Sequence, residues 1–256
     1  MSIQAQSPDP LLQGLGITRP YRRRSEIIRE DDAANRVYEV ISGTVCTCKM
    51  LRDGRRQIAG FYFSGDLFGL EAARTHALSA QAITDAEVRT IKKQALNALA
   101  SAHGDFADRL LALTARDLAR KQDLMLFLSR SAQDRIIYFL VEMAQRTSPK
   151  EDSISLPMSR QDIGDYLGLK IETVSRVFWD LERRGAIEVA GRHTIVLRND
   201  PTNLSAKRLM AIFEAVKGRQ PQTEQELETW RASAEGKAAT LFDLTTISIW
   251  GERARS

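Results

Sequence analysis

The sequence predicts an α+β protein with an N-terminal β-roll (jelly-roll) domain, a long central helix and a C-terminal winged helix-turn-helix. Three observations predict this order. Short β-rich runs separated by turn residues fill the segment 22–91. A helical stretch with apolar residues at heptad spacing covers 106–128. Two short helical patterns joined by a glycine, followed by a β-hairpin pattern, occupy 158–198.

The β-rich segment contains four runs typical of strands, at 37–41, 45–51, 57–63 and 78–84. Turn signals lie between them, at Ser42-Gly43, Asp53-Gly54 and Gly65-Asp66. Asp-Gly between two such runs is a strong hairpin signal. Short strands at this regular spacing favour an antiparallel barrel or jelly roll.

In the helical stretch, Leu111, Leu118 and Met125 recur every seven residues, with Leu128 and Thr114 at intermediate positions. A row of this kind forms the seam of a two-stranded coiled coil, so these residues are predicted to join two copies of the chain. Lys121 occupies one seam position and predicts a looser interface than a leucine zipper. The alternative is that the helix packs only on its own domain. A second amphipathic helix is expected over 132–146.

The helix-turn-helix pattern begins at Ser159. Asp162 follows three residues later, which resembles a capping box with Asp in place of the usual Glu or Gln. Ile163 and Leu167 lie four residues apart, as expected for side chains that face a partner helix. Gly168 permits the left-handed backbone that ends a helix.

The second helix of the pattern is predicted from Ile171 to Arg184, with Gly185 as its stop. One face is covered by apolar residues at spacings of 3, 4 and 7, namely Val174, Val177, Phe178 and Leu181. The opposite side carries Glu172, Arg176, Trp179 and Arg183, with Ser175 at its edge. The helix is therefore amphipathic, with a polar face toward solvent or a ligand.

Glu172, Ser175 and Arg176 have the chemistry needed to read base pairs. Arginine donates two hydrogen bonds to guanine, a carboxylate accepts one from cytosine N4, and serine contacts either kind of pair. The N-terminal end of the second helix enters the major groove in this motif. The pattern therefore predicts a sequence-specific partner, double-stranded DNA. The alternative is an amphipathic helical hairpin with an ordinary solvated face.

After Gly185, two β-rich runs flank Ala190-Gly191-Arg192, a pattern typical of a hairpin. This hairpin completes a winged helix-turn-helix. Arg192 and His193 near the turn are suited to contact phosphate or to lie in solvent, and the sequence favours neither.

Length and composition exclude several classes of protein. The chain has 256 residues, enough for two domains, and no apolar run approaches the roughly 18 residues that a membrane span needs. The segment 1–10 has no apolar signal-peptide core, so we expect a cytoplasmic protein with no membrane partner. The net charge is +4, but residues 159–200 contain seven basic and seven acidic side chains. DNA affinity must therefore come from the placement of charge.

The order of domains resembles the CRP/FNR family of bacterial transcription regulators over residues 22–199. The most specific part is Ile171-Glu-Thr-Val-Ser-Arg176, which matches the E-x-x-S-R recognition signature of the FNR and FixK branch. The phrases most similar to FixK-like members are Val37-Tyr-Glu-Val-Ile-Ser-Gly43, Asp53-Gly-Arg-Arg-Gln57 and Asp162-Ile-Gly-Asp-Tyr-Leu-Gly168.

The resemblance implies a homodimer that binds a palindrome with TTGA-type half-sites. Glu172, Ser175 and Arg176 would read bases, with Arg176 on the guanine. The other DNA-contacting positions it implies are Ser159, Arg160, Lys170, Ile171 and Thr173. Lys170 stands where relatives often carry Thr or Ser, which removes a helix cap worth about 1 kcal/mol but offers a cation to phosphate.

The resemblance also implies the domain boundaries and the role of the protein. We expect an N-terminal arm, a cyclic-nucleotide-binding-like β-roll, a dimerisation helix, the winged helix-turn-helix and a C-terminal extension, at 1–21, 22–101, 102–130, 131–199 and 200–256. The role would be activation of genes for low-oxygen respiration or nitrogen fixation through contact with RNA polymerase. The extension is expected to be flexible or loosely packed, with a docking segment as the alternative.

No cofactor is expected. In members that bind cyclic nucleotides, an arginine holds the phosphate, but Leu78 occupies that position here and Glu71 is displaced by one residue. Burying the phosphate without a cation would be costly. An iron–sulfur cluster needs about four cysteines, and the chain has only Cys46 and Cys48. We interpret these as two small buried thiols, with a redox pair as the alternative.

The three histidines, His76, His103 and His193, are scattered, so no metal site is expected. There is no nucleophile with a paired base and no phosphate-cradling glycine loop, so the chain is predicted not to be an enzyme and to have no catalytic residues. A ligand- or redox-responsive regulator acting as a repressor is the alternative function.

Overall fold

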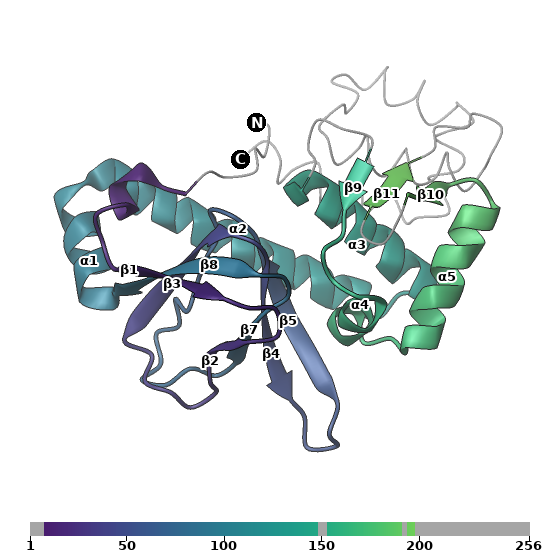
Figure 1. Cartoon of the computed structure of the whole chain (residues 1–256), viewed down its shortest axis with the longest axis horizontal. Helices are drawn as coiled ribbons and strands as arrows, with labels where there is room; N and C mark the ends of the chain where they lie inside the picture. Colours follow the sequence, from purple (N-terminus) through teal and green to yellow (C-terminus); the bar gives the residue numbers. More distant parts are fainter. Residues whose placement is uncertain (1–7, 148–152, 191–193, 198–256) are drawn as a thin grey trace. The chain divides into compact units, whose positions relative to one another are not determined.

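The computed structural model describes residues 8–147, 153–190 and 194–197 (Figure 1). The chain divides into two compact units. Among the described residues, the first unit contains 8–135 and 157–171, and the second contains 136–147, 153–156, 172–190 and 194–197. The division passes through the helix-turn-helix, directly after Ile171.

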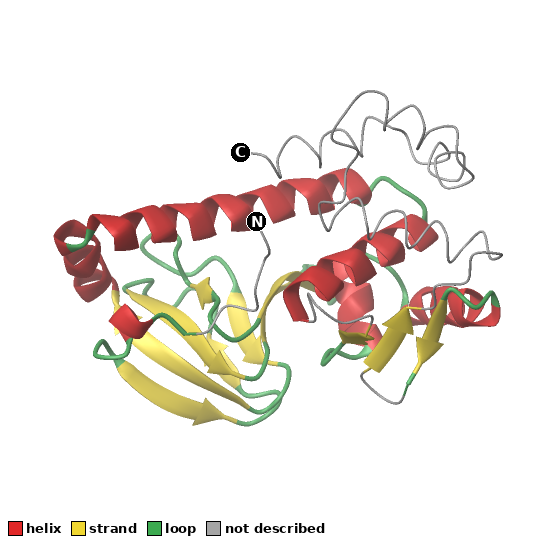
Figure 2. Ribbon diagram, turned by 90° about the horizontal axis from the view of Figure 1, so that it is seen from above, coloured by secondary structure: helices red, strands yellow, loops and turns green. Residues whose placement is uncertain are grey.

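The first unit is built around two four-stranded antiparallel sheets, with strand orders β1-β8-β3-β6 and β2-β7-β4-β5 (Figures 1 and 2). Their strands are β1 Ile17–Tyr21, β2 Glu26–Ile28, β3 Arg36–Ser42, β4 Val45–Met50, β5 Arg56–Tyr62, β6 Leu67–Phe68, β7 Ser79–Ala82 and β8 Ala86–Lys92. Apolar side chains from both sheets form one core, including Val40, Val45, Tyr62 and Val88. The predicted β-roll is therefore confirmed.

The four predicted strand runs correspond to β3, β4, β5 and β7. Strand β1 lies in the segment expected to be an arm, and it pairs with β8 from Ile17 opposite Thr90 to Tyr21 opposite Ala86. The sheet therefore begins before residue 22. The sequence does not indicate β1 because it is an edge strand with no alternating apolar face, and Pro20 weakens the strand pattern.

Gly43, in the turn between β3 and β4, has φ +81°, and a Cβ built there would lie 2.2 Å from the backbone oxygen of Asp85. We expect Gly43→Ala to reduce the free energy of unfolding by about 2–5 kcal/mol, because left-handed backbone strain adds to displacement of packed atoms. Urea denaturation measures the loss.

Gly54, at the β4–β5 turn, provides the matched control for Gly43. It has φ +80° but nothing within 4 Å of a built Cβ. Gly54→Ala should therefore cost only the backbone strain of about 1–2 kcal/mol. If Gly43→Ala and Gly54→Ala lose the same free energy of unfolding, the steric part of the explanation for Gly43 is wrong.

Two helices follow the sheets, α1 over Lys93–Ala102 and α2 over Gly104–Phe127 (Figure 2). Helix α2 agrees with the predicted long helix at 106–128 to within two residues. Helix α1 was not predicted, since its first residue follows strand β8 directly and Lys92 provides no side-chain cap. Leu96 of α1 and Phe106 of α2 share a small core with Leu12. Leu12 belongs to a short 3-10 helix, Pro10–Leu12.

The remaining elements are helices α3 Ala132–Thr147, α4 Arg160–Leu167 and α5 Ile171–Arg183, and strands β9 Ser153–Ser155, β10 Ile187–Val189 and β11 Thr194–Leu197. Helix α3 confirms the expected helix at 132–146. The antiparallel pair β10–β11 confirms the predicted hairpin, although its turn at 191–193 lies outside the described residues. Strand β9 adds a third strand that is too short to give a periodic signal. The extension at 200–256 also lies outside the described residues.

Candidate nucleic-acid interface

Helix α4 begins at a capping box, as the sequence predicts. The backbone N–H of Asp162 donates to Ser159 Oγ at 3.1 Å, and the backbone N–H of Ser159 donates to Asp162 Oδ2 at 2.9 Å. Both bonds satisfy amides that have no partner within the helix. The shorter aspartate side chain therefore performs the role that Glu or Gln usually has.

Helix α4 ends at Gly168, which has φ +65°. The amide of Leu169 bonds to the oxygen of Gly164 at 2.9 Å, which closes the last turn. Ile163 and Leu167 are buried, as their four-residue spacing indicates. A turn of three residues, 168–170, then leads to the first residue of α5.

Helix α5 separates its side chains as the helical projection predicts. Val174, Phe178 and Leu181 are buried, whereas Glu172, Ser175 and Arg176 are exposed. Gly185, with φ +66°, follows the helix, and the amide of Ala186 bonds to the oxygen of Leu181 at 2.9 Å. The helix ends at Arg183, one residue before the predicted end. A carboxylate and a guanidinium thus lie one helical turn apart on an exposed face.

The other predicted DNA-contacting residues differ in exposure. Lys170 and Ile171 are exposed, whereas Ser159, Arg160 and Thr173 are half-buried. Their predicted contacts with DNA stay predictions. Lys170 offers its ammonium at the turn before α5, where the helix N-terminus favours an anion.

Trp179 is 57% exposed on the face of α5 that carries Arg176. The guanidinium carbon of Arg183 lies 4.8 Å from the centre of the Trp179 ring, in a cation–π arrangement. This contact fixes the orientation of Trp179 and Arg183, which lie one and two helical turns after Arg176. The sequence shows their shared face but not their contact.

Helix α2 leaves the predicted seam uncovered in the single chain. Leu111, Leu118 and Met125 are 69%, 57% and 73% exposed, and Leu128 is half-buried. A row of exposed apolar side chains is typical of a protein–protein contact. Lys121 Nζ lies 2.8 Å from Asp117 Oδ2, so the seam cation is paired within its own helix.

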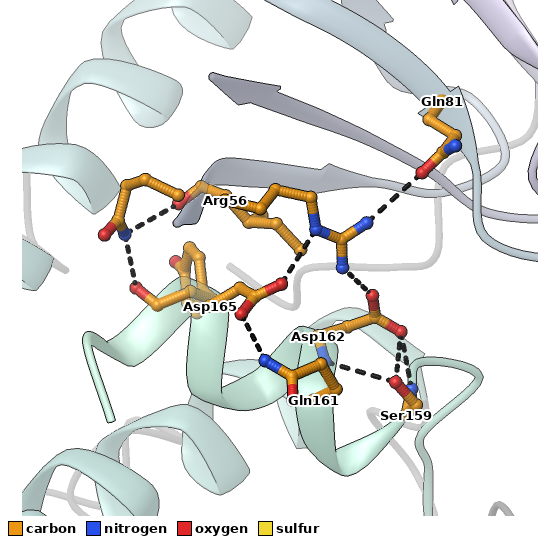
Figure 3. A network of polar contacts seen from close by, with 9 residues as sticks. Arg56, Gln81, Ser159, Gln161, Asp162 and Asp165 are labelled. Atoms are coloured by element: carbon orange, nitrogen blue, oxygen red, sulfur yellow. Dashed lines mark hydrogen bonds and ion pairs between the residues drawn. The ribbon is translucent and has the colours of Figure 1, made fainter. Parts of the chain in front are cut away.

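A polar network joins α4 to strand β5 inside the first unit, and Figure 3 shows it from close by. Arg56 Nε donates to Asp165 Oδ2 at 2.7 Å, and Arg56 Nη2 pairs with Asp162 Oδ1. Burial acts to raise the pKa of Asp162, but hydrogen bonds from Ser159 and Arg56 outweigh it and hold this pKa below its usual value. The sequence gives no local signal for this network.

The β-roll positions compared above with cyclic-nucleotide-binding members are Glu71 and Leu78. His76 is buried, and its Nδ1 lies 3.2 Å from Glu71 Oε2. The ammonium of Lys93 donates to the backbone oxygen of Glu71. Leu78 is half-buried. The absence of a cyclic nucleotide stays a prediction.

Cys46 and Cys48 are both buried, as predicted, and their thiols are not bridged. The register of β4 shifts between Thr47 and Cys48, so the strand is irregular between the two thiols. A hydrogen bond with Cys48, together with burial, raises the pKa of Cys46.

Among the described residues, no group of three or more His, Cys, Asp or Glu is arranged to hold a metal ion. None of the described helices has the length and apolar character needed to span a bilayer.

Comparison with known proteins gives matches to both parts of the chain. The model of the Crp-like helix-turn-helix domain matches residues 134–206, and that of the cyclic nucleotide-binding domain matches 18–103. The nitrogen fixation regulation protein FixK of Azorhizobium caulinodans is 39% identical over 75% of this chain and 79% of its own length. FixK of Rhizobium meliloti is 35% identical over 76% of this chain and 89% of its own length.

Among solved structures, FixK2 from Bradyrhizobium japonicum superposes with a TM-score of 0.69 and 43% sequence identity, covering 77% of this chain and 96% of FixK2. A β-roll followed by a Crp-type helix-turn-helix with an exposed recognition face defines a DNA-binding transcription regulator. The chain belongs to the CRP/FNR family of these regulators, in its FixK-like branch. Its matched relatives are regulators, so the prediction that it is not an enzyme is confirmed.

Proposed function

We propose that the chain is a transcription activator that binds TTGA-type palindromes as a homodimer and controls genes for low-oxygen respiration or nitrogen fixation. The observation that carries the proposal is the exposed trio Glu172, Ser175 and Arg176 near the N-terminus of α5. The names of the relatives support the biological role. Two of them are nitrogen fixation regulators, and the 34% identical Anr of Pseudomonas protegens is a transcriptional activator.

Each member of the trio has a distinct task in the proposed complex. The Arg176 guanidinium donates two hydrogen bonds to the guanine of TTGA, and the Glu172 carboxylate accepts from a cytosine amino group. Ser175 contacts a neighbouring base edge. These residues would specify the DNA sequence, because each base pair presents a different pattern of hydrogen-bond donors and acceptors in the major groove.

The other proposed DNA contacts come from the turn before α5, from the first turn of α5 and from the start of α4. Lys170 supplies a cation, and Ile171 and Thr173 supply apolar or backbone contacts. Ser159 and Arg160 lie at the start of the first helix of the motif, which crosses the DNA backbone in this class of protein. Contacts with phosphate position the protein and carry no sequence information.

Two copies are proposed to associate through Leu111, Leu118, Met125 and Leu128 of α2. A two-fold dimer presents two α5 helices to half-sites one helical turn apart, which matches a palindromic operator. The protein would act in the cytoplasm, where the chromosome and RNA polymerase are. RNA polymerase is the proposed partner in activation.

The test is a gel-shift titration with a TTGA-N6-TCAA duplex and a scrambled duplex of the same composition, at one fixed salt concentration. We expect the operator to bind about a thousandfold more tightly, the lower end of the range for specific DNA-binding proteins. Equal affinity for the two duplexes would overturn the proposed operator. A reporter gene with the operator placed upstream of its promoter then distinguishes activation from repression.

The alternative is a redox-responsive regulator, and the buried, unbridged thiols of Cys46 and Cys48, two residues apart on strand β4, are the observation that favours it. The same titration, performed with and without a thiol oxidant such as diamide, separates the two functions. Binding that changes with oxidation, and that no longer changes in a variant with serine at both positions, favours the alternative. Binding that is unaffected by oxidant favours the first proposal.

A further inference from the structure

Arg56, the first residue of strand β5, connects the β-roll to the first helix of the helix-turn-helix (Figure 3). We propose that Arg56 is a positioning residue for DNA binding, which fixes α4 on the β-roll and neutralises two acidic side chains of that helix. This inference rests on the proposed DNA contacts of α4 and α5. It assigns a role in DNA binding to a residue of the β-roll.

The guanidinium of Arg56 uses each of its three nitrogens for a different partner. Nε donates to Asp165 at 2.7 Å, Nη2 pairs with Asp162, and Nη1 donates to Gln81 Oε1 of strand β7 at 3.2 Å. A lysine ammonium does not reproduce this planar, forked arrangement. The geometry therefore specifies arginine and not merely a positive charge.

The network is largely shielded from water. The side chains of Arg56, Asp162 and Asp165 are 25%, 13% and 11% exposed. Shielding strengthens the attraction but makes an unpaired carboxylate unfavourable. Removal of Arg56 therefore leaves two carboxylates without the cation that compensates their burial.

Further contacts connect β5 and α4 independently of these charges. Gln57 Nε2 donates to the backbone oxygen of Tyr166 at 3.4 Å, and the rings of Phe61 and Tyr166 lie 5.2 Å apart in a tilted arrangement. Helix α4 and β5 belong to the same compact unit. A variant at position 56 should thus loosen this contact without abolishing it.

The position of α4 matters for DNA because α4 precedes the recognition helix by only three residues, 168–170. Because only these three residues separate the two helices in the chain, we expect a displacement of α4 to move the start of α5 at Ile171, directly before Glu172. In addition, unneutralised carboxylates on the helix that crosses the DNA backbone would repel phosphates. Both effects predict weaker binding when Arg56 is removed.

Asp162 also couples Arg56 to the start of α4. Its Oδ1 pairs with Arg56, while its Oδ2 accepts from the Ser159 amide at 2.9 Å and from the Ser159 hydroxyl at 2.6 Å. Ser159 is itself a proposed DNA-contacting residue. The Asp162 carboxylate thus contacts Arg56 of the β-roll and also forms the cap at Ser159, which is proposed to lie next to the DNA phosphates.

The experiment compares the full-length protein with Arg56→Gln by fluorescence anisotropy on operator and scrambled duplexes. We expect operator affinity to fall about tenfold or more, and the preference for operator over scrambled DNA to narrow. The matched control is Arg55→Gln, since Arg55 is exposed and pairs only locally with Asp53. This control should bind within about twofold of the parent protein.

A rescue variant tests the neutralising part of the role, and urea denaturation of each variant measures any general loss of stability. Arg56→Gln combined with Asp162→Asn and Asp165→Asn removes the carboxylates that need a cation but keeps an oxygen to accept from Ser159. We expect it to regain most of the lost operator affinity. Should Arg56→Gln fail to fold by circular dichroism, Arg56→Lys replaces it, with an expected smaller loss, because lysine keeps the charge but not the forked geometry.

Three results would overturn the inference: operator binding by Arg56→Gln that equals or exceeds that of the parent, an equal loss in Arg55→Gln, or no rescue by the two asparagines. The proposed operator is judged separately, from the parent protein alone. If the parent protein does not discriminate operator from scrambled DNA, the proposed operator is wrong. The role of Arg56 is then decided by comparing the affinities of the parent, Arg56→Gln and Arg55→Gln for DNA of either sequence.

Discussion

Arg176→Ala is expected to weaken binding of the dimer to the TTGA operator by about 2–6 kcal/mol, since a bidentate arginine–guanine contact contributes about 1–3 kcal/mol and a palindrome contains two of them. The side chain is exposed on α5 and lies one turn from Glu172. Its removal should leave the fold unchanged, because it does not belong to the buried face of the helix.

A base substitution assigns the contact to Arg176. Operators with the TTGA guanine replaced in both half-sites should bind the parent protein weakly, whereas Arg176→Ala should no longer distinguish them from the native operator. The matched control is Arg184→Ala, an exposed arginine after the end of α5. It should retain discrimination and at most reduce the salt dependence. Normal operator binding by Arg176→Ala would contradict the assigned role.

Leu118→Glu is expected to convert the proposed dimer into a monomer and to weaken operator binding about 100- to 10,000-fold, the gain that linking two binding modules usually provides. Leu118 lies at the centre of the predicted seam and is 57% exposed in the single chain. In a dimer it would be buried, and a carboxylate there would face its counterpart across the two-fold axis.

Analytical ultracentrifugation gives the mass, and anisotropy with the operator gives the affinity. Arg116→Glu is the control, because this exposed residue lies two positions from Leu118 and on the other side of α2. It should leave both measurements unchanged. A Leu118→Glu protein that remains dimeric would show that the seam has a different role, such as packing on its own domain.

The helix-turn-helix could be predicted closely because its signals are local. The Ser159–Asp162 box, the left-handed Gly168 and the stop at Gly185 each act within a few residues, so each element end agrees with the structure to within one residue. The exposed position of Arg176 follows from helical periodicity alone. The paired strands of the hairpin followed from turn residues in the same way.

Features that depend on distant contacts could not be predicted. Arg56 and Asp162 are separated by 106 residues, and no pattern in either segment indicates the other. Strand β1 is stabilised by pairing with β8, about seventy residues later, rather than by its own composition. Helix α1 has no side-chain cap. Tertiary packing determines all three features, so a single sequence read locally does not show them.

The cation at position 121 has a consequence for the amount of protein that a cell must make. In a parallel pairing of two α2 helices, the Lys121 side chains meet across the axis, and each is tied to Asp117 of its own helix. In the proposed dimer, a seam weakened in this way would let the subunits separate at low concentration. Occupancy of a two-fold operator then rises with the square of the monomer concentration, so a modest change in synthesis or proteolysis produces a steeper change at the promoter.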